Sequence, residues 1–163
     1  GNSGVGKTTL LSRYLDSCVV DYSHERTNDL VIVKYQLQNL KLQIWDMIQH
    51  DNSASPHVLL RVTHGAAIVF DLTKRRSFES VRKWRSSIHD PSHICLMLVG
   101  NKTDLKKRRV ISFEEARALA DEMGMFYIET SAKNSASLRF CFETLAKVSF
   151  EMGKARRKAQ RDS

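Results

Sequence analysis

The 163-residue sequence contains no run of 18 or more apolar residues, so it predicts no segment that crosses a membrane. It has only three cysteines, Cys18, Cys95 and Cys141, which are scattered and lack the spacing of metal ligands. Such cysteines are typical of buried or neutral thiols in a reducing compartment. Internal repeats and domain linkers are also lacking, and the length suits one domain with its own core.

Negative charge is scarce relative to positive charge, since 26 lysines and arginines stand against 18 aspartates and glutamates and give a net charge of +8. A surplus of this kind is compatible with nucleic acid, an anionic membrane surface or an acidic partner. Much of it lies in residues 106–109 and 154–161. No aromatic residues alternate with either run, so we expect no nucleic-acid partner, and solvated surface is the simpler interpretation.

Hydrophobic spacing predicts strands that alternate with helices. The predicted strands are residues 30–37, 41–46, 66–70, 94–99 and 125–128. The predicted helices are residues 7–16, 78–88, 112–123 and 138–152. The continuous apolar runs at 66–70 and 94–99 are typical of strands buried on both faces of a parallel sheet. This alternation indicates an α/β sheet with right-handed crossovers.

The first eight residues form a complete G-x-x-x-x-G-K-[ST] motif. Its glycines let the backbone wrap closely around phosphates, and the helix that begins near Lys7 adds its positive N-terminal end. We expect Lys7 to reach the β- and γ-phosphates and the Thr8 hydroxyl to hold Mg²⁺. The alternative is a glycine-rich turn before a helix. The predicted nucleotide-binding residues here are Gly1, Asn2, Ser3, Gly4, Val5, Gly6, Lys7, Thr8 and Thr9.

A second motif, Asn101-Lys102-Thr103-Asp104, follows an apolar strand directly. It resembles the guanine-reading N-K-x-D element of the Ras-like GTPases. The resemblance implies that the Asp104 carboxylate accepts two hydrogen bonds from guanine, whereas adenine has no donor at N1 and would leave the carboxylate unsatisfied. It also implies that Asn101 braces the loop and that Lys102 lies along the base.

A third motif, residues 129–133, follows the last predicted strand and resembles the E-T-S-A-K element of the same family. The resemblance implies that a backbone N–H near Ala132 contacts the guanine carbonyl and that Ser131 steadies the loop, with Lys133 completing the site. Three loops at the carboxyl ends of parallel strands would then converge on one ligand.

Residues 41–46 and 65–73, with Ser77 and Phe78, resemble the Rab proteins in particular. The resemblance implies a three-layer P-loop NTPase (Ras-like) α/β domain over residues 1–152, with a mostly parallel sheet and one antiparallel edge strand. A basic flexible tail is expected at residues 153–163.

The same resemblance implies a molecular switch in vesicle trafficking that binds GTP or GDP with Mg²⁺. Its implied partners are an exchange factor, a GTPase-activating protein and effectors, and its implied location is the cytoplasm or the cytosolic face of endomembranes. The prenylated cysteines of the family are not among these residues, so a membrane contact is expected only if a lipidated C-terminus lies beyond this chain.

The second switch departs from the Rab pattern. Asp46 is expected to support Mg²⁺ through water, but Gln49 and His50 then replace the family's Gly-Gln pair. Gln49 stands where the glycine N–H meets the γ-phosphate, and His50 stands where the glutamine orients water. His50 is therefore the candidate catalytic residue, the alternative being a surface residue in a loop. The change predicts very slow GTP hydrolysis.

The first switch and the first strand depart from the pattern too. Thr27 is the only threonine between Thr9 and Thr63, so it is the candidate Mg²⁺ ligand of the first switch. In the family a central strand precedes the phosphate loop, whereas this sequence starts on the first glycine of the motif. We therefore expect the first strand to be missing from the sheet, with unpaired backbone groups left there. A non-cycling GTP-binding scaffold and a non-functional fragment are the alternatives to a switch.

Overall fold

A computed structural model describes residues 1–18, 22–26, 30–37, 40–47, 62–88 and 91–162. The helices and strands in chain order are α1 (Lys7–Cys18), β1 (Tyr22–Arg26), β2 (Leu30–Leu37), β3 (Leu40–Met47), β4 (Gly65–Asp71), α3 (Arg75–Glu79), α4 (Val81–Ser86), β5 (Cys95–Asn101), α5 (Phe113–Glu122), β6 (Phe126–Glu129) and α6 (Ser135–Arg161). Every predicted strand and helix is present, so the predicted α/β alternation is confirmed. The helix predicted at 78–88 is divided into α3 and α4 at Ser80.

The strands form two sheets of three. β1, β2 and β3 form an antiparallel sheet, and β4, β5 and β6 form a parallel one. The sequence predicts one sheet with an antiparallel edge strand, whereas within the described residues β3 and β4 do not pair with each other. The interruption lies between β3 and β4. Gly1 stands beside it, so close to β4 that a Cβ atom would come within 2.0 Å of the Val69 carbonyl oxygen.

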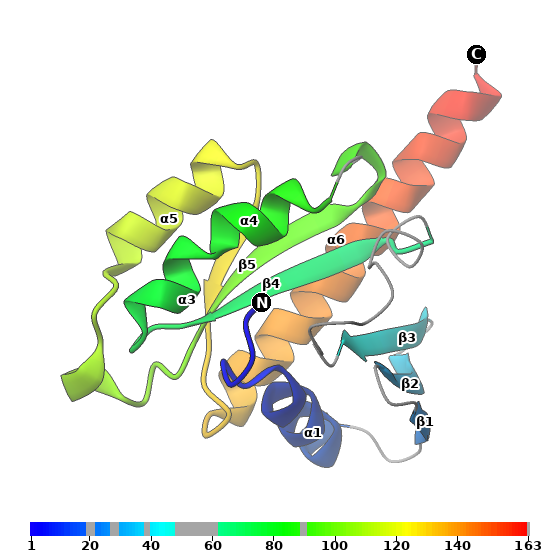
Figure 1. Cartoon of the computed structure of the whole chain (residues 1–163). Coiled ribbons are helices and arrows are strands. Elements are labelled where there is room, and N and C mark those ends of the chain that lie inside the picture. The colour runs from blue at the N-terminus through cyan, green and yellow to red at the C-terminus, as the bar shows by residue number, and fades with distance from the viewer. Residues whose placement is uncertain (19–21, 27–29, 38–39, 48–61, 89–90, 163) are drawn as a thin grey trace.

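The parallel sheet is covered on both faces, which gives the three predicted layers (Figure 1). In β4, Ile68 and Phe70 belong to a core cluster that includes Val81 of α4, whereas Val69 belongs to a second cluster that includes Leu138 of α6. This alternation follows from the two-residue period of a strand. Helices α3, α4 and α5 thus pack on one face of the sheet, and α6, together with Leu10 of α1, packs on the other.

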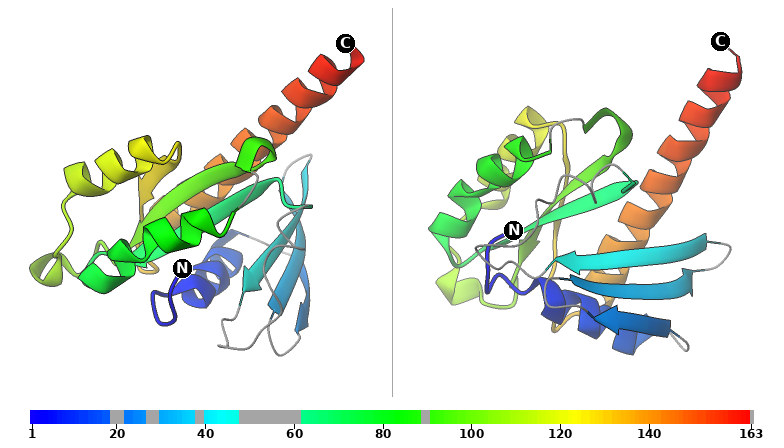
Figure 2. Two further views of the ribbon diagram at one scale, coloured as in Figure 1. Left: turned by 45° about the horizontal axis from the view of Figure 1, so that its top comes forward. Right: turned by 45° about the vertical axis from the view of Figure 1, so that its right-hand side comes forward.

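The antiparallel sheet packs against α1. Leu11, Tyr14 and Leu15 form a buried row on α1, and Leu42 and Ile44 of β3 lie against this row. The row has helical spacing, and Leu42 and Ile44 have strand spacing, so each element presents one apolar face to the other. Figure 2 shows the antiparallel sheet beside α1 and separate from the parallel sheet.

Helix α6 continues to Arg161, so the segment predicted as a flexible tail is helical over most of its length. Its composition explains the difference, because alanine, lysine, arginine and glutamine all have high helix propensity. The end of α6 projects away from the rest of the molecule (Figure 1). None of the described helices is long and apolar enough to cross a membrane.

Candidate nucleotide-binding site

The phosphate loop takes its shape from two glycines with positive φ, Gly4 at 72° and Gly6 at 99°. Such backbone angles are unfavourable for residues with a side chain. Gly6 is also tightly packed, since a Cβ atom there would lie 2.6 Å from Nδ2 of Asn101. The loop leads directly into α1, where the N–H of Leu10 donates to the carbonyl of Gly6 at 2.9 Å.

The Lys7 side chain folds back over this loop. Its Nζ donates to the carbonyl oxygens of Gly1 and Asn2, at 2.9 Å each. Burial lowers the pKa of Lys7, and the nearby Asp46 carboxylate partly offsets that effect. The ammonium group is therefore held at the loop that the sequence predicts to surround phosphate. A cation beside a glycine loop at a helix N-terminus suits an anionic ligand.

The two described residues predicted to serve Mg²⁺ lie together. The Thr8 hydroxyl donates to the buried Asp46 carboxylate at 2.5 Å, which joins the start of α1 to β3. A hydroxyl and a carboxylate supply the hard oxygen atoms that Mg²⁺ prefers, so this pair fits the ion. Thr27, Gln49 and His50 lie outside the described residues, so their predicted roles stay predictions.

Asn101 and Lys102 connect the guanine-reading loop to the phosphate loop. The Asn101 side chain is buried and donates to the carbonyl of Val5 at 2.8 Å. Lys102 has a φ of 72°, and its Nζ donates to the Oδ2 atom of Asp71 at 2.7 Å, across the end of the sheet. Burial raises the pKa of Asp71, but hydrogen bonds from Lys102 and Thr73 outweigh it and hold the pKa below its usual value.

Asp104 lies between two residues of the third motif. One carboxylate oxygen accepts from the Ser131 hydroxyl at 2.6 Å, and the other lies 3.0 Å from the Lys133 ammonium. The hydrogen bond from Ser131, followed by that from Lys133, lowers the pKa of Asp104. The aspartate is therefore ionised at neutral pH and can accept the paired N–H donors that guanine presents. Ala132 stands between the two partners and packs partly against the core.

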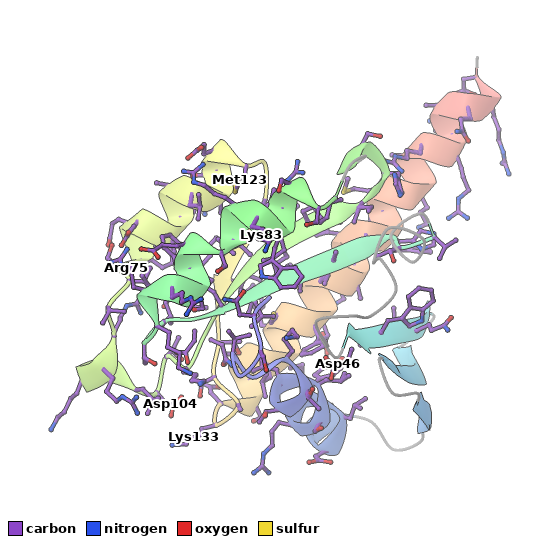
Figure 3. The ribbon with its side chains drawn as sticks, in the orientation of Figure 1. Asp46, Arg75, Lys83, Asp104, Met123 and Lys133 are labelled. Atoms are coloured by element: carbon purple, nitrogen blue, oxygen red, sulfur yellow. The ribbon has the colours of Figure 1, made fainter. Side chains whose placement is uncertain are left out.

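The groups that the sequence predicts to bind nucleotide lie on both sides of α1 (Figure 3). In Figure 3, Asp104 and Lys133 lie on one side of α1 and Asp46 lies on the other. The phosphate loop directly precedes α1. Asn101 donates a hydrogen bond to the Val5 carbonyl of this loop, and Thr8 donates one to the Asp46 carboxylate. The sequence-predicted residues that the structure describes are thus gathered at one end of the parallel sheet.

Several site residues were not predicted as such from the sequence. Asp71 is fully buried at the end of β4, and an aspartate that ends an apolar run was the available signal. Glu129 accepts from both terminal nitrogens of Arg109 and, at 2.6 Å, from the Tyr127 hydroxyl. Burial raises the pKa of Glu129, but the Arg109 and Tyr127 hydrogen bonds bring it below its usual value. These bonds fix the strand end that carries Ser131.

Comparison with known proteins agrees with this geometry. A family model described as the Ras family matches residues 1–151. The Ras-related protein RABA5e of Arabidopsis thaliana is 39% identical over 153 residues, which cover 88% of this chain and 68% of that protein. The Ras-related protein RABD1 of the same plant is 38% identical over 152 residues, covering 90% and 74%. Ras-related protein Rab-25 of Homo sapiens is 36% identical over 159 residues, covering 92% and 73%.

The chain therefore belongs to the Ras family of small GTPases and, within it, to the Rab-type members. The predicted Ras-like domain is confirmed by the family match.

Proposed function

We propose that this chain is a Rab-type molecular switch of intracellular vesicle trafficking that binds GTP or GDP with Mg²⁺ and hydrolyses GTP very slowly. The observation that carries the proposal is the convergence of residues 1–8, 101–104 and 131–133 at one end of the parallel sheet. Open α/β sheets bind their ligands at the carboxyl ends of their strands. Exchange factors, activating proteins and effectors are the corresponding partners, on the cytosolic face of an endomembrane.

Each described residue has one task in nucleotide binding. The phosphate loop directs backbone N–H groups inward, and Lys7 adds a positive charge to the phosphates. Thr8 would hold Mg²⁺ directly and Asp46 would hold it through water, and the ion when bound neutralises phosphate charge. Asp104 selects guanine, and Asn101, Lys102 and Ser131 keep the two base-reading loops in place.

Slow hydrolysis follows from residues 49 and 50. A glycine at position 49 would let the backbone approach the γ-phosphate freely, whereas Gln49 restricts it. His50 replaces the glutamine that orients the attacking water in Ras-like proteins. Ras without a partner hydrolyses GTP at only about 10⁻⁴ s⁻¹, and losing the water-positioning group lowers such a rate further. The same two substitutions favour a second candidate, a scaffold that binds GTP without cycling.

Single-turnover hydrolysis of bound GTP tests the proposal. We expect the unmodified chain to hydrolyse GTP well below about 10⁻⁴ s⁻¹, and the double variant Gln49→Gly, His50→Gln to be faster. The exposed Lys106→Ala is the matched control and leaves the rate unchanged. Hydrolysis by the unmodified chain at the ordinary Ras rate contradicts the proposal. Equal binding of a partner to the GDP form and to a form with a non-hydrolysable GTP analogue favours the scaffold over the switch.

A further inference from the structure

The side chain of Asn2 links the phosphate loop to helices α3 and α4. Its Nδ2 donates to the hydroxyl oxygen of Ser80 at 3.0 Å, and its Oδ1 accepts from Nε1 of Trp84 at 2.7 Å. Both ends of the Asn2 amide are thus bonded to residues about eighty positions away in the sequence. These two hydrogen bonds therefore occupy both polar atoms of the Asn2 side chain, which is not available to a phosphate.

The far end of this contact is rigid. Ser80 lies at the junction of α3 and α4, and its own hydroxyl donates to the carbonyl of Arg76 at 2.8 Å. The next residue, Val81, is fully buried in the core, and Trp84 packs against the same core cluster. A polar contact is well positioned when the residues that support it are locked by packing. The two helices therefore offer Asn2 a fixed donor and a fixed acceptor.

The near end of the contact reaches Lys7. The carbonyl of Asn2 accepts from the Lys7 ammonium, so the backbone that the Asn2 side chain fixes is also the backbone that holds Lys7. Gly4, two positions along, has a φ of 72° and nothing within 4 Å of a hypothetical Cβ atom. The loop is open and conformationally permissive there, so its position depends on anchors elsewhere.

We propose that Asn2 is a positioning residue, which holds the phosphate loop and Lys7 in their binding geometry through its hydrogen bonds to Trp84 and Ser80. This inference rests on the proposed nucleotide binding and deepens it. Asn2 was predicted from the motif as a nucleotide-binding residue, whereas both polar atoms of its side chain are hydrogen-bonded to Ser80 and Trp84. Losing the contact lets the loop move and shortens the time for which nucleotide stays bound.

Tryptophan fluorescence and nucleotide release together test the role of Asn2. The chain has two tryptophans, and Nε1 of Trp45 is buried without a hydrogen-bond partner among the described residues. Trp45→Phe therefore removes no such hydrogen bond, and all tryptophan fluorescence then comes from Trp84. In this background, Asn2→Ala should change the Trp84 emission and speed GDP release about tenfold, which corresponds to about 1.4 kcal/mol. For the release rates alone, both variants are also made with Trp45 retained, and there Trp84→Phe should speed release by a smaller factor than Asn2→Ala.

A double-mutant cycle separates positioning from general destabilisation. If Trp84 acts through Asn2, then adding Trp84→Phe to Asn2→Ala causes little further increase in the GDP release rate. Lys83→Ala is the matched control, because Lys83 lies on the same helix as Trp84 and lines, with Asn2 and Trp84, a cavity beside the loop. We expect it to leave GDP release unchanged, and circular dichroism verifies that each variant is folded.

The possible results are distinct. Unchanged Trp84 emission in Asn2→Ala overturns the contact itself, whether or not nucleotide is bound. Changed emission with unchanged GDP release, or strictly additive effects in the cycle, overturns the positioning role. An ordinary hydrolysis rate would contradict the proposed function alone, since neither fluorescence nor GDP release depends on hydrolysis.

Discussion

The Thr8 hydroxyl and the Asp46 carboxylate are joined by a hydrogen bond of 2.5 Å, although they lie 38 positions apart in the sequence. The bond connects the first turn of α1 to β3. It brings together a hydroxyl and a carboxylate at the end of the phosphate loop, and both groups supply the oxygen ligands that Mg²⁺ prefers. Two elements from different parts of the fold therefore supply the residues that are predicted to hold Mg²⁺.

Removing the Thr8 hydroxyl should weaken the dependence of nucleotide retention on Mg²⁺. In the unmodified chain, EDTA should accelerate GDP release strongly, because Thr8 and Asp46 would hold an ion that neutralises phosphate charge. In Thr8→Ala, release should already be fast with Mg²⁺ present, and EDTA should add little. Stopped-flow measurement of GDP release checks this, with Ser12→Ala on the exposed side of α1 as the control. A full EDTA response in Thr8→Ala would refute the assignment.

The two glycines of the phosphate loop should differ in their tolerance of alanine. Gly4→Ala adds only backbone strain, about 1–2 kcal/mol, because nothing lies near its Cβ position. Gly6→Ala adds similar strain and also drives Asn101 away from the carbonyl of Val5, which costs about 1–3 kcal/mol more. Urea unfolding of both variants measures the difference. Equal losses in the free energy of unfolding would show that the contact of Gly6 with Asn101 is not structurally important.

Much of the fold could be predicted from local sequence, because its strands and helices carry their own periodic apolar residues. Ile68, Val69 and Phe70 illustrate this, since a continuous apolar run indicates a strand covered on both faces. β1 was missed because Tyr-Ser-His-Glu-Arg has no apolar alternation, and its strand conformation is evident only from pairing with β2. Likewise, composition alone suggested flexibility at the end of α6, where helix propensity prevails.

The same distinction applies to the candidate site, where contiguous motifs could be predicted from the sequence and contacts between distant residues could not. The phosphate and guanine motifs are contiguous in the sequence, so their residues could be named without a structure. The hydrogen bond from Trp84 to Asn2 joins residues 82 positions apart, and the one from Arg109 to Glu129 joins residues 20 positions apart. Nothing in the spacing of those residues indicates that they meet. Such contacts depend on how helices pack on the sheet, which local patterns do not determine.

The Glu129 carboxylate should make stability depend on pH in the acid range. Its pKa is lowered in the folded state, so its stabilisation is fully present above the ordinary value of 4.5 and is lost as the pH falls through the lower folded value. Glu129→Gln should therefore lower the free energy of unfolding by about 2 kcal/mol at pH 7 and less in acid, because it weakens the bonds from Arg109. Thermal unfolding between pH 7 and pH 3 measures this, with the exposed Glu151→Gln as the control. A constant difference at every pH would contradict the account.

Asp104 should determine which base is bound. Its carboxylate would accept two hydrogen bonds from guanine, and a base without those donors would leave it unsatisfied. Asp104→Ala should therefore weaken GDP binding by about 10²-fold or more while leaving ATP binding little changed, since a lost charged pair costs about 3 kcal/mol. Asp121→Ala, on the exposed face of α5, is the control. Competition binding with GDP and ATP provides the measurement, and an undiminished guanine preference in Asp104→Ala would assign base recognition elsewhere.

Guanine binding is the central claim, and titration of the unmodified chain with GDP, GTP and ATP in the presence of Mg²⁺ tests it most directly. Asp104, held by Ser131 and Lys133 beside the phosphate loop, predicts tight binding of both guanine nucleotides and far weaker binding of ATP. Equal affinity for the three nucleotides, or binding of none of them, would contradict it.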